Sequence, residues 1–153
     1  MLTQPTFSSP TPLPGSTDGL ERFLVVRLSD RSVAIRVSDT RGVVELQAIT
    51  PVPRAGAVLH GIIAARGAVI PLFSLMALLN QPVTSPPLLG VLLEPDGLLF
   101  AVAVDEVLDF ALLPCQPAGS AALLTPIDQS GRPLDILHLP TLLQLFAERL
   151  VHP

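Results

Sequence analysis

The chain has 153 residues, of which 49% are hydrophobic and only 14% are charged, a low charged fraction for a globular domain. This length suits one domain with a sizeable core. All nine basic residues are arginine and the net charge is −4, so the composition lacks the basic patch that a nucleic-acid binder needs. Cys115 is the single cysteine, which excludes an internal disulfide and favours a cytoplasmic location.

The N-terminal segment differs in composition from the rest. Residues 1–19 are rich in proline, serine and threonine, so we expect a flexible tail that buries too little apolar surface to order itself. This segment lacks the basic start and the continuous apolar run of a secretory signal. The long uncharged span 67–93 is interrupted by prolines, which argues against a membrane helix and direct membrane insertion. We therefore predict one domain over residues 20–153, in which no internal repeat with matching residues is visible.

Short apolar segments dominate this domain. Residues 22–28 and 32–37 flank a polar turn and predict a β-hairpin, and residues 42–46 predict a third strand. Two more hairpins are predicted around Arg66-Gly67 and around Pro95-Asp96-Gly97, because glycine supplies positive φ in tight turns. The flanking strands are residues 60–65 and 68–73 for the first turn, and 88–94 and 98–104 for the second. Several are apolar on both faces, which is typical of strands in small packed barrels.

Two helices are expected. Residues 74–80 begin with serine, a good N-cap, and end before Gln-Pro. Residues 139–151 have proline near the first turn and a helical apolar face. That face comprises Leu139, Leu142, Leu143, Phe146 and Leu150. Many strands and few helices predict an all-β fold of barrel type with short helices, including a C-terminal one.

The side chains that could carry metal or thiol chemistry are scattered. His60, His138 and His152 are far apart and have no cysteine or carboxylate at metal-ligand spacing, so no metal site is expected. Cys115 has no local catalytic partner, which favours an unreactive thiol. We expect no cofactor.

One acidic motif is similar to a catalytic loop. Residues 38–42 read Ser-Asp-Thr-Arg-Gly and are similar to the Asp-Thr-Gly loop of aspartic proteases, but Arg41 separates the threonine from its glycine. A small hydrolase using Asp39 or Cys115 is therefore the weakest hypothesis. No catalytic residue is assigned.

Residues 23–37, 49–75, 98–110 and 134–143 form four blocks that carry a further signal. Taken in this order, they resemble the CheW-like domain of bacterial chemotaxis signalling. The second block is similar to the family pattern Gly-Val-x-Asn-Leu-Arg-Gly-x-Val-Ile-Pro-Val-x-Asp-Leu. Its matching positions are Gly61, Arg66, Gly67, Val69, Ile70, Pro71 and Leu75. The third block resembles the family's Val-Asp-x-Val segment through Val104, Asp105 and Val107.

The sequence departs from the family pattern at Ala64-Ala65, where the family has Asn-Leu, at Ser74, where it has Asp, and at a position that concerns the arginine. Gly42 stands where the family often has a glutamate that could pair with it. Glu45 and Asp39 are the alternative acidic partners for Arg66. Arg66 itself has two interpretations, as a solvated turn residue or as a partner contact.

The resemblance implies two small SH3-like five-stranded barrels around a shared core, and a non-catalytic adaptor. Such an adaptor couples the cytoplasmic tips of chemoreceptors to the regulatory domain of a CheA-type histidine kinase, in chemotaxis or in twitching motility. The partner-binding candidates are Arg66, Gly67, Gly61, Val69, Pro71, Glu45 and Asp105. The alternative is a generic SH3-like interaction module outside chemosensing. Its proline groove needs clustered aromatic rings, whereas this chain has no Trp or Tyr and only six Phe.

Overall fold

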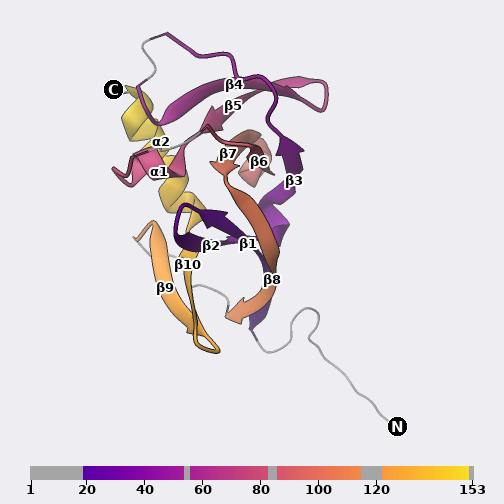
Figure 1. The fold of residues 1–153 in the computed structure, drawn as a ribbon, viewed down its shortest axis with the longest axis vertical. Helices are drawn as coiled ribbons and strands as arrows, with labels where there is room; N and C mark the ends of the chain where they lie inside the picture. Colours follow the sequence, from indigo (N-terminus) through magenta and orange to yellow (C-terminus); the bar gives the residue numbers. More distant parts are fainter. Residues whose placement is uncertain (1–18, 54–55, 83–85, 115–121, 152–153) are drawn as a thin grey trace.

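The computed structural model describes residues 19–53, 56–82, 86–114 and 122–151, with the side chains of residues 149–151 excepted. Its strands form two five-stranded sheets (Figure 1). Sheet A has the order β8-β1-β2-β10-β9 and consists of β1 (Leu20–Leu28), β2 (Arg31–Arg36), β8 (Glu106–Pro114), β9 (Leu124–Gln129) and β10 (Arg132–Leu137). Sheet B has the order β3-β6-β7-β5-β4 and consists of β3 (Thr40–Glu45), β4 (Leu59–Ala65), β5 (Ala68–Phe73), β6 (Leu89–Leu93) and β7 (Phe100–Val104).

Tight turns explain where the chain reverses. Arg66 and Gly67 have φ of 53° and 74°, and Ser130 and Gly131 have φ of 53° and 82°. Two successive residues of positive φ form the kind of two-residue turn whose twist matches that of the flanking strands. The hairpin predicted around Arg66-Gly67 is therefore confirmed, with β4 antiparallel to β5. A second hairpin of this kind, β9 to β10, was not predicted.

The two sheets repeat one arrangement. In each, a central antiparallel pair (β1 and β2, or β6 and β7) pairs on one side with an antiparallel edge strand and on the other with a parallel strand from a hairpin. Equivalent rows can be read from the pairings. One row of sheet A is Asp109-Val25-Ala34-Ile136-Thr125, and its counterpart in sheet B is Gly42-Leu92-Ala101-Leu72-Gly61. The chain thus has a structural repeat, although few of the equivalent residues are identical.

Three apolar clusters hold the sheets. The largest lies between them and takes residues from β1, β2, β6, β7 and both helices. Each sheet also has a smaller cluster on its other face, centred on Phe23 in sheet A and on Leu72 in sheet B. Strands of the central pairs are therefore buried on both faces, which confirms the reading of their continuous apolar sequence.

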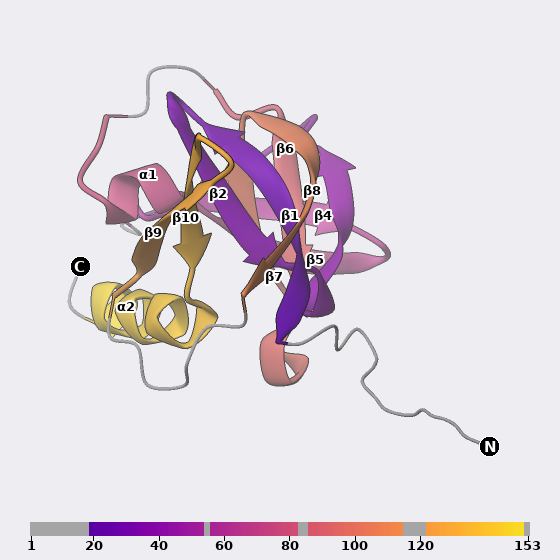
Figure 2. The same cartoon turned by 90° about the horizontal axis from the view of Figure 1, so that it is seen from below.

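The two helices cover the junction of the sheets (Figure 2). α2 (Leu139–Val151) inserts Leu142 and Phe146, which are 0% and 4% exposed, as its apolar pattern predicted; the side chain of Leu150 lies outside the described residues. α1 (Leu75–Leu78) is shorter than predicted. Ser74 caps it by accepting a hydrogen bond from the amide of Ala77, and Asn80 ends it with φ of 59°. Short 3-10 turns, η3 (Val37–Asp39) and η4 (Pro95–Gly97), complete the described elements.

The prediction of two closed barrels is corrected, because the described strand pairings leave both sheets open. In sheet A, β8 and β9 are edges that share no backbone ladder. In sheet B, β3 and β4 are the edges, and a single bridge between Thr50 and Ile62 ties the chain after β3 to β4. Side chains, rather than a ladder, span each opening. No described helix is long and apolar enough to cross a membrane.

Candidate partner-binding site

Arg66 occupies the tip of the β4–β5 hairpin and is exposed. Its guanidinium folds back over Gly42 on β3, so close that a Cβ placed on Gly42 would lie 3.2 Å from Cζ and would collide with Nη2. Gly42 has φ of 128° at a bulge in the β3–β6 pairing, a conformation that favours glycine. The absence of a side chain at position 42 therefore makes room for the arginine.

No carboxylate lies within ion-pairing distance of Arg66 in the part of the chain that the structure describes. The alternative partners predicted for it lie elsewhere. Asp39 accepts a hydrogen bond from Nε of Arg36 at 3.0 Å. Glu45 is exposed on β3 and makes no ion pair with a described arginine. Both predicted substitutes for the missing family glutamate are thus wrong as internal partners of Arg66.

The other arginines with described side chains are engaged. Arg27, Arg31, Arg36, Arg41 and Arg132 each pair with a carboxylate. Arg22 lies over the ring of Phe110, with Cζ 5.4 Å from the ring centroid. Arg66 therefore differs from its neighbours in carrying an unmatched positive charge at a hairpin tip.

In sheet A the position equivalent to Gly42 belongs to an ion pair. Arg132 follows the β9–β10 turn and donates from Nη1 and Nη2 to the two carboxylate oxygens of Asp109, at 2.9 and 3.1 Å. These hydrogen bonds lower the pKa of Asp109 and raise that of Arg132. Asp109 stands in the row position that Gly42 occupies in sheet B. One opening is thus spanned by a matched pair and the other by a cation without its anion.

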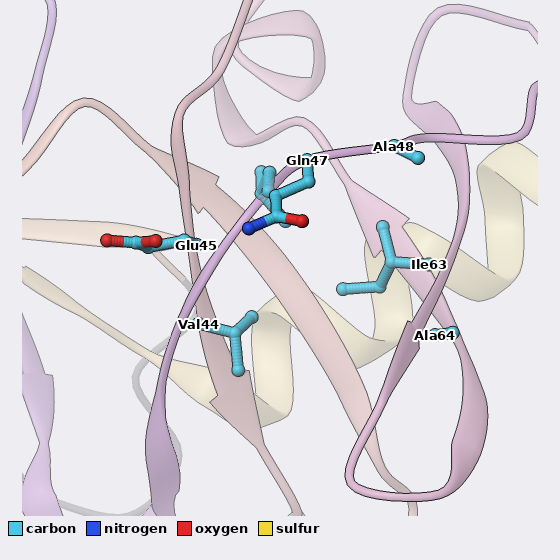
Figure 3. A pocket seen from close by; sticks show the side chains of 7 residues that line it. Val44, Glu45, Gln47, Ala48, Ile63 and Ala64 are labelled. Atoms are coloured by element: carbon cyan, nitrogen blue, oxygen red, sulfur yellow. The ribbon is translucent and has the colours of Figure 1, made fainter.

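A pocket of about 210 Å³ lies in the opening between β3 and β4, and its lining ends two residues before Arg66, at Ala64. Its lining residues are Val44, Glu45, Leu46, Gln47, Ala48, Ile63 and Ala64. Figure 3 shows Val44 and Ile63 pointing into the gap and the amide of Gln47 lying across it, while Glu45 points away. The pocket therefore offers an apolar floor with one amide at its rim.

The hairpin that carries Arg66 also exposes an apolar face. Val69 is 74% exposed on β5, opposite the exposed Ala64 on β4. Pro71, which pairs with Ile62, is half-buried further along the same face, and Gly67 is exposed at the tip. The candidates Arg66, Gly67, Val69 and Pro71 are thus brought together on one hairpin.

Two of the candidates serve the chain itself. A Cβ on Gly61 would collide with the carbonyl oxygen of Thr50, so this buried glycine permits the bridge between β4 and the chain after β3. Asp105 accepts a hydrogen bond from the amide of Ser29 at 2.6 Å and lies 3.7 Å from Nη1 of Arg27. Asp105 thereby fixes the β1–β2 turn of sheet A, and its described contacts are with that turn rather than with Arg66.

The described residues contain no cluster of three or more histidine, cysteine, aspartate or glutamate side chains that could hold a metal. His138 contacts Thr141 at 2.5 Å, at the start of α2. Burial lowers the pKa of His60, which favours its neutral form. Cys115 and His152 lie outside the described residues.

Sequence reasoning missed one surface. Leu108, Phe110 and Leu112 alternate along β8 and are 39%, 59% and 52% exposed. Leu20, at 37%, stands opposite the end of this strand. The period-two spacing of apolar residues over 108–112 is the sequence signal that could have revealed the stripe.

Comparisons with known proteins agree with this architecture. A family model described as the CheW-like domain matches residues 22–144. The crystal structure of the scaffolding protein TtCheW from Thermoanaerobacter tengcongensis is similar, with a TM-score of 0.65 and 19% sequence identity over 78% of this chain and 89% of that chain. No curated protein sequence matches the chain.

Proposed function

The chain belongs to the CheW-like domain family of chemotaxis scaffolding adaptors, and we propose that it is a non-catalytic, cytoplasmic adaptor that couples chemoreceptors to a CheA-type histidine kinase. The family match over residues 22–144 carries this proposal. An adaptor of this kind needs apolar and charged surface for its partners and no reactive group. The described surface has both an apolar, arginine-bearing hairpin and an apolar stripe on β8.

The partners that we propose are the regulatory domain of the kinase and the cytoplasmic tip of a receptor. Arg66, Gly67, Val69 and Pro71 form the proposed contact surface on the β4–β5 hairpin. Glu45 flanks it from β3, on the side that points away from the pocket. Gly61 permits sheet B's bridge next to this hairpin, and Asp105 holds the β1–β2 turn of sheet A.

The generic SH3-like module is less well supported. Peptide grooves for proline-rich segments are lined with exposed aromatic rings. Among the phenylalanines that the structure describes, Phe23, Phe73, Phe100 and Phe146 are buried and only Phe110 is exposed. The described surface therefore lacks the ring cluster that such a groove requires.

The test is binding of the purified full chain to the regulatory domain of the co-encoded CheA-type kinase, and separately to a receptor cytoplasmic tip, by isothermal titration calorimetry. We expect saturable binding to the regulatory domain at micromolar concentration or below. Binding to neither partner, by a chain whose circular dichroism shows it to be folded, would contradict the proposed function.

A further inference from the structure

We propose that the opening between β3 and β4 receives a segment of the kinase's regulatory domain that carries an aspartate or glutamate, and that Arg66 binds this carboxylate over Gly42. The inference rests on the proposed function and names the chemistry of one contact. It assigns to the partner the negative charge that this chain does not supply beside Arg66.

The first support is charge. Among the arginines whose side chains the structure describes, Arg66 alone has neither a carboxylate nor an aromatic ring against it. An arginine guanidinium is planar and binds a carboxylate through two parallel hydrogen bonds. Its position over Gly42, rather than extended into water, holds that donor surface at the edge of the opening.

The second support is the repeat. At the same row position sheet A places Asp109, and a hairpin arginine, Arg132, binds it with two hydrogen bonds. Sheet B has glycine in place of the acid, and its arginine stands in the turn itself, at the position that Ser130 has in sheet A, two residues before the counterpart of Arg132. The fold therefore contains, in one chain, an example of the pair that a partner would complete at Arg66.

The third support is the backbone of the turn. Arg66 has φ of 53°, and a residue other than glycine, asparagine or aspartate pays for this conformation with about 1 kcal/mol or more. Sheet A has the small polar residue Ser130 at the equivalent turn position with the same φ of 53°, whereas sheet B has the long, charged side chain of Arg66 there. A role for the guanidinium outside the turn explains why arginine stands there.

The fourth support is the pocket, which indicates the kind of side chain that accompanies the carboxylate in the partner segment. Val44 is two residues from Gly42 on β3, on the same face of the strand and roughly 7 Å along it. An extended partner segment with its acid on Arg66 would therefore place an apolar side chain, two residues away, against Val44 and Ile63. We expect the pattern acidic-x-apolar, or its reverse, in the bound segment.

The experiment compares two arginine variants in calorimetric titrations with the regulatory domain. Arg66→Gln removes the charge at the unmatched hairpin, and Arg132→Gln removes it at the matched one. We expect Arg66→Gln to weaken binding about tenfold or more, because a charge-assisted contact is lost, and Arg132→Gln to change it less than about twofold. Circular dichroism and thermal unfolding of both variants verify that they remain folded.

Charge exchange identifies the partner residue. Arg66→Glu is titrated against a set of regulatory domains in which surface Asp or Glu residues are changed singly to Arg, and one of them is expected to restore at least about tenfold of the lost affinity. Equal losses in Arg66→Gln and Arg132→Gln, unchanged binding in Arg66→Gln, or no restoring partner variant would overturn the inference while leaving the adaptor function intact. Absence of binding by the unsubstituted chain would overturn both.

Discussion

Sheet A and sheet B have the same strand arrangement, yet their open edges are spanned differently. Sheet A joins its hairpin to β8 by the Arg132–Asp109 pair, whereas sheet B has Arg66 over a glycine and a pocket between β3 and β4. In sheet A the hairpin arginine thus has an acidic partner within the chain, whereas in sheet B it has none among the described residues. The difference teaches that two halves of a repeated fold can hold their open edges together with different side-chain contacts.

The largest expected effect tests whether one core joins the two sheets. Phe146 of α2 stacks on Phe73 of sheet B at 4.0 Å between ring centroids and meets Phe100 edge-on at 5.7 Å. Phe146→Ala should lower the free energy of unfolding by about 3–5 kcal/mol. Urea unfolding should remain a single transition. The control is Glu148→Ala, an exposed change on the same helix, which should alter the unfolding free energy by no more than about 0.5 kcal/mol. Two separate transitions in the Phe146 variant would argue that the sheets unfold independently.

The next effect concerns the bridge that partly closes sheet B. Gly61→Ala should cost about 2–4 kcal/mol, because its φ of 153° is strained for alanine and its new Cβ would meet the carbonyl of Thr50. Gly67→Ala is the matched control. It also has positive φ but nothing within 4 Å, so only about 1–2 kcal/mol should be lost. Similar losses in chemical denaturation would show that the close approach to Thr50 contributes little.

Several of these features were predictable from sequence and others were not. Gly67 after Arg66 marked a turn between two apolar segments, and the spacing of Leu142 and Phe146 marked a buried helix face; both are local signals. β9 was missed because its sequence contains Pro126 and buries little of its surface. The contacts of Arg132 with Asp109 and of Arg66 with Gly42 join strands distant in sequence, so no local pattern encodes them.

A smaller effect is expected at sheet A's ion pair. Asp109 and Arg132 are largely solvent-accessible, so Asp109→Asn should lower stability by less than about 1 kcal/mol. The pKa of Asp109 is lower in the folded chain than in the unfolded one. Its stabilisation is therefore present above the unfolded pKa and is lost as pH falls through the folded pKa. Urea titrations at neutral pH and near pH 3 give the unfolding free energies of the variant and of the unsubstituted chain. The difference between these two free energies should be smaller at pH 3. An unchanged difference would contradict the ionic origin of the stabilisation.

The smallest effect is a pH dependence from sheet B. Burial lowers the pKa of His60 in the folded state, so the unfolded chain binds more protons between the two pKa values. Stability from this residue is complete above the unfolded pKa of about 6.5 and falls as pH drops below it. His60→Gln should therefore flatten the decline in unfolding free energy between pH 7.5 and pH 5.5. An equally steep decline in the variant would assign the effect to another group.

The central claim is that Arg66 is completed by a partner's carboxylate, and a crystal structure of the chain bound to the kinase's regulatory domain tests it most directly. We predict that an aspartate or glutamate of the regulatory domain lies within about 3 Å of the Arg66 guanidinium, as Asp109 does with Arg132. A complex in which the β3–β4 opening is empty, or in which Arg66 faces water while the regulatory domain binds elsewhere, would contradict the claim.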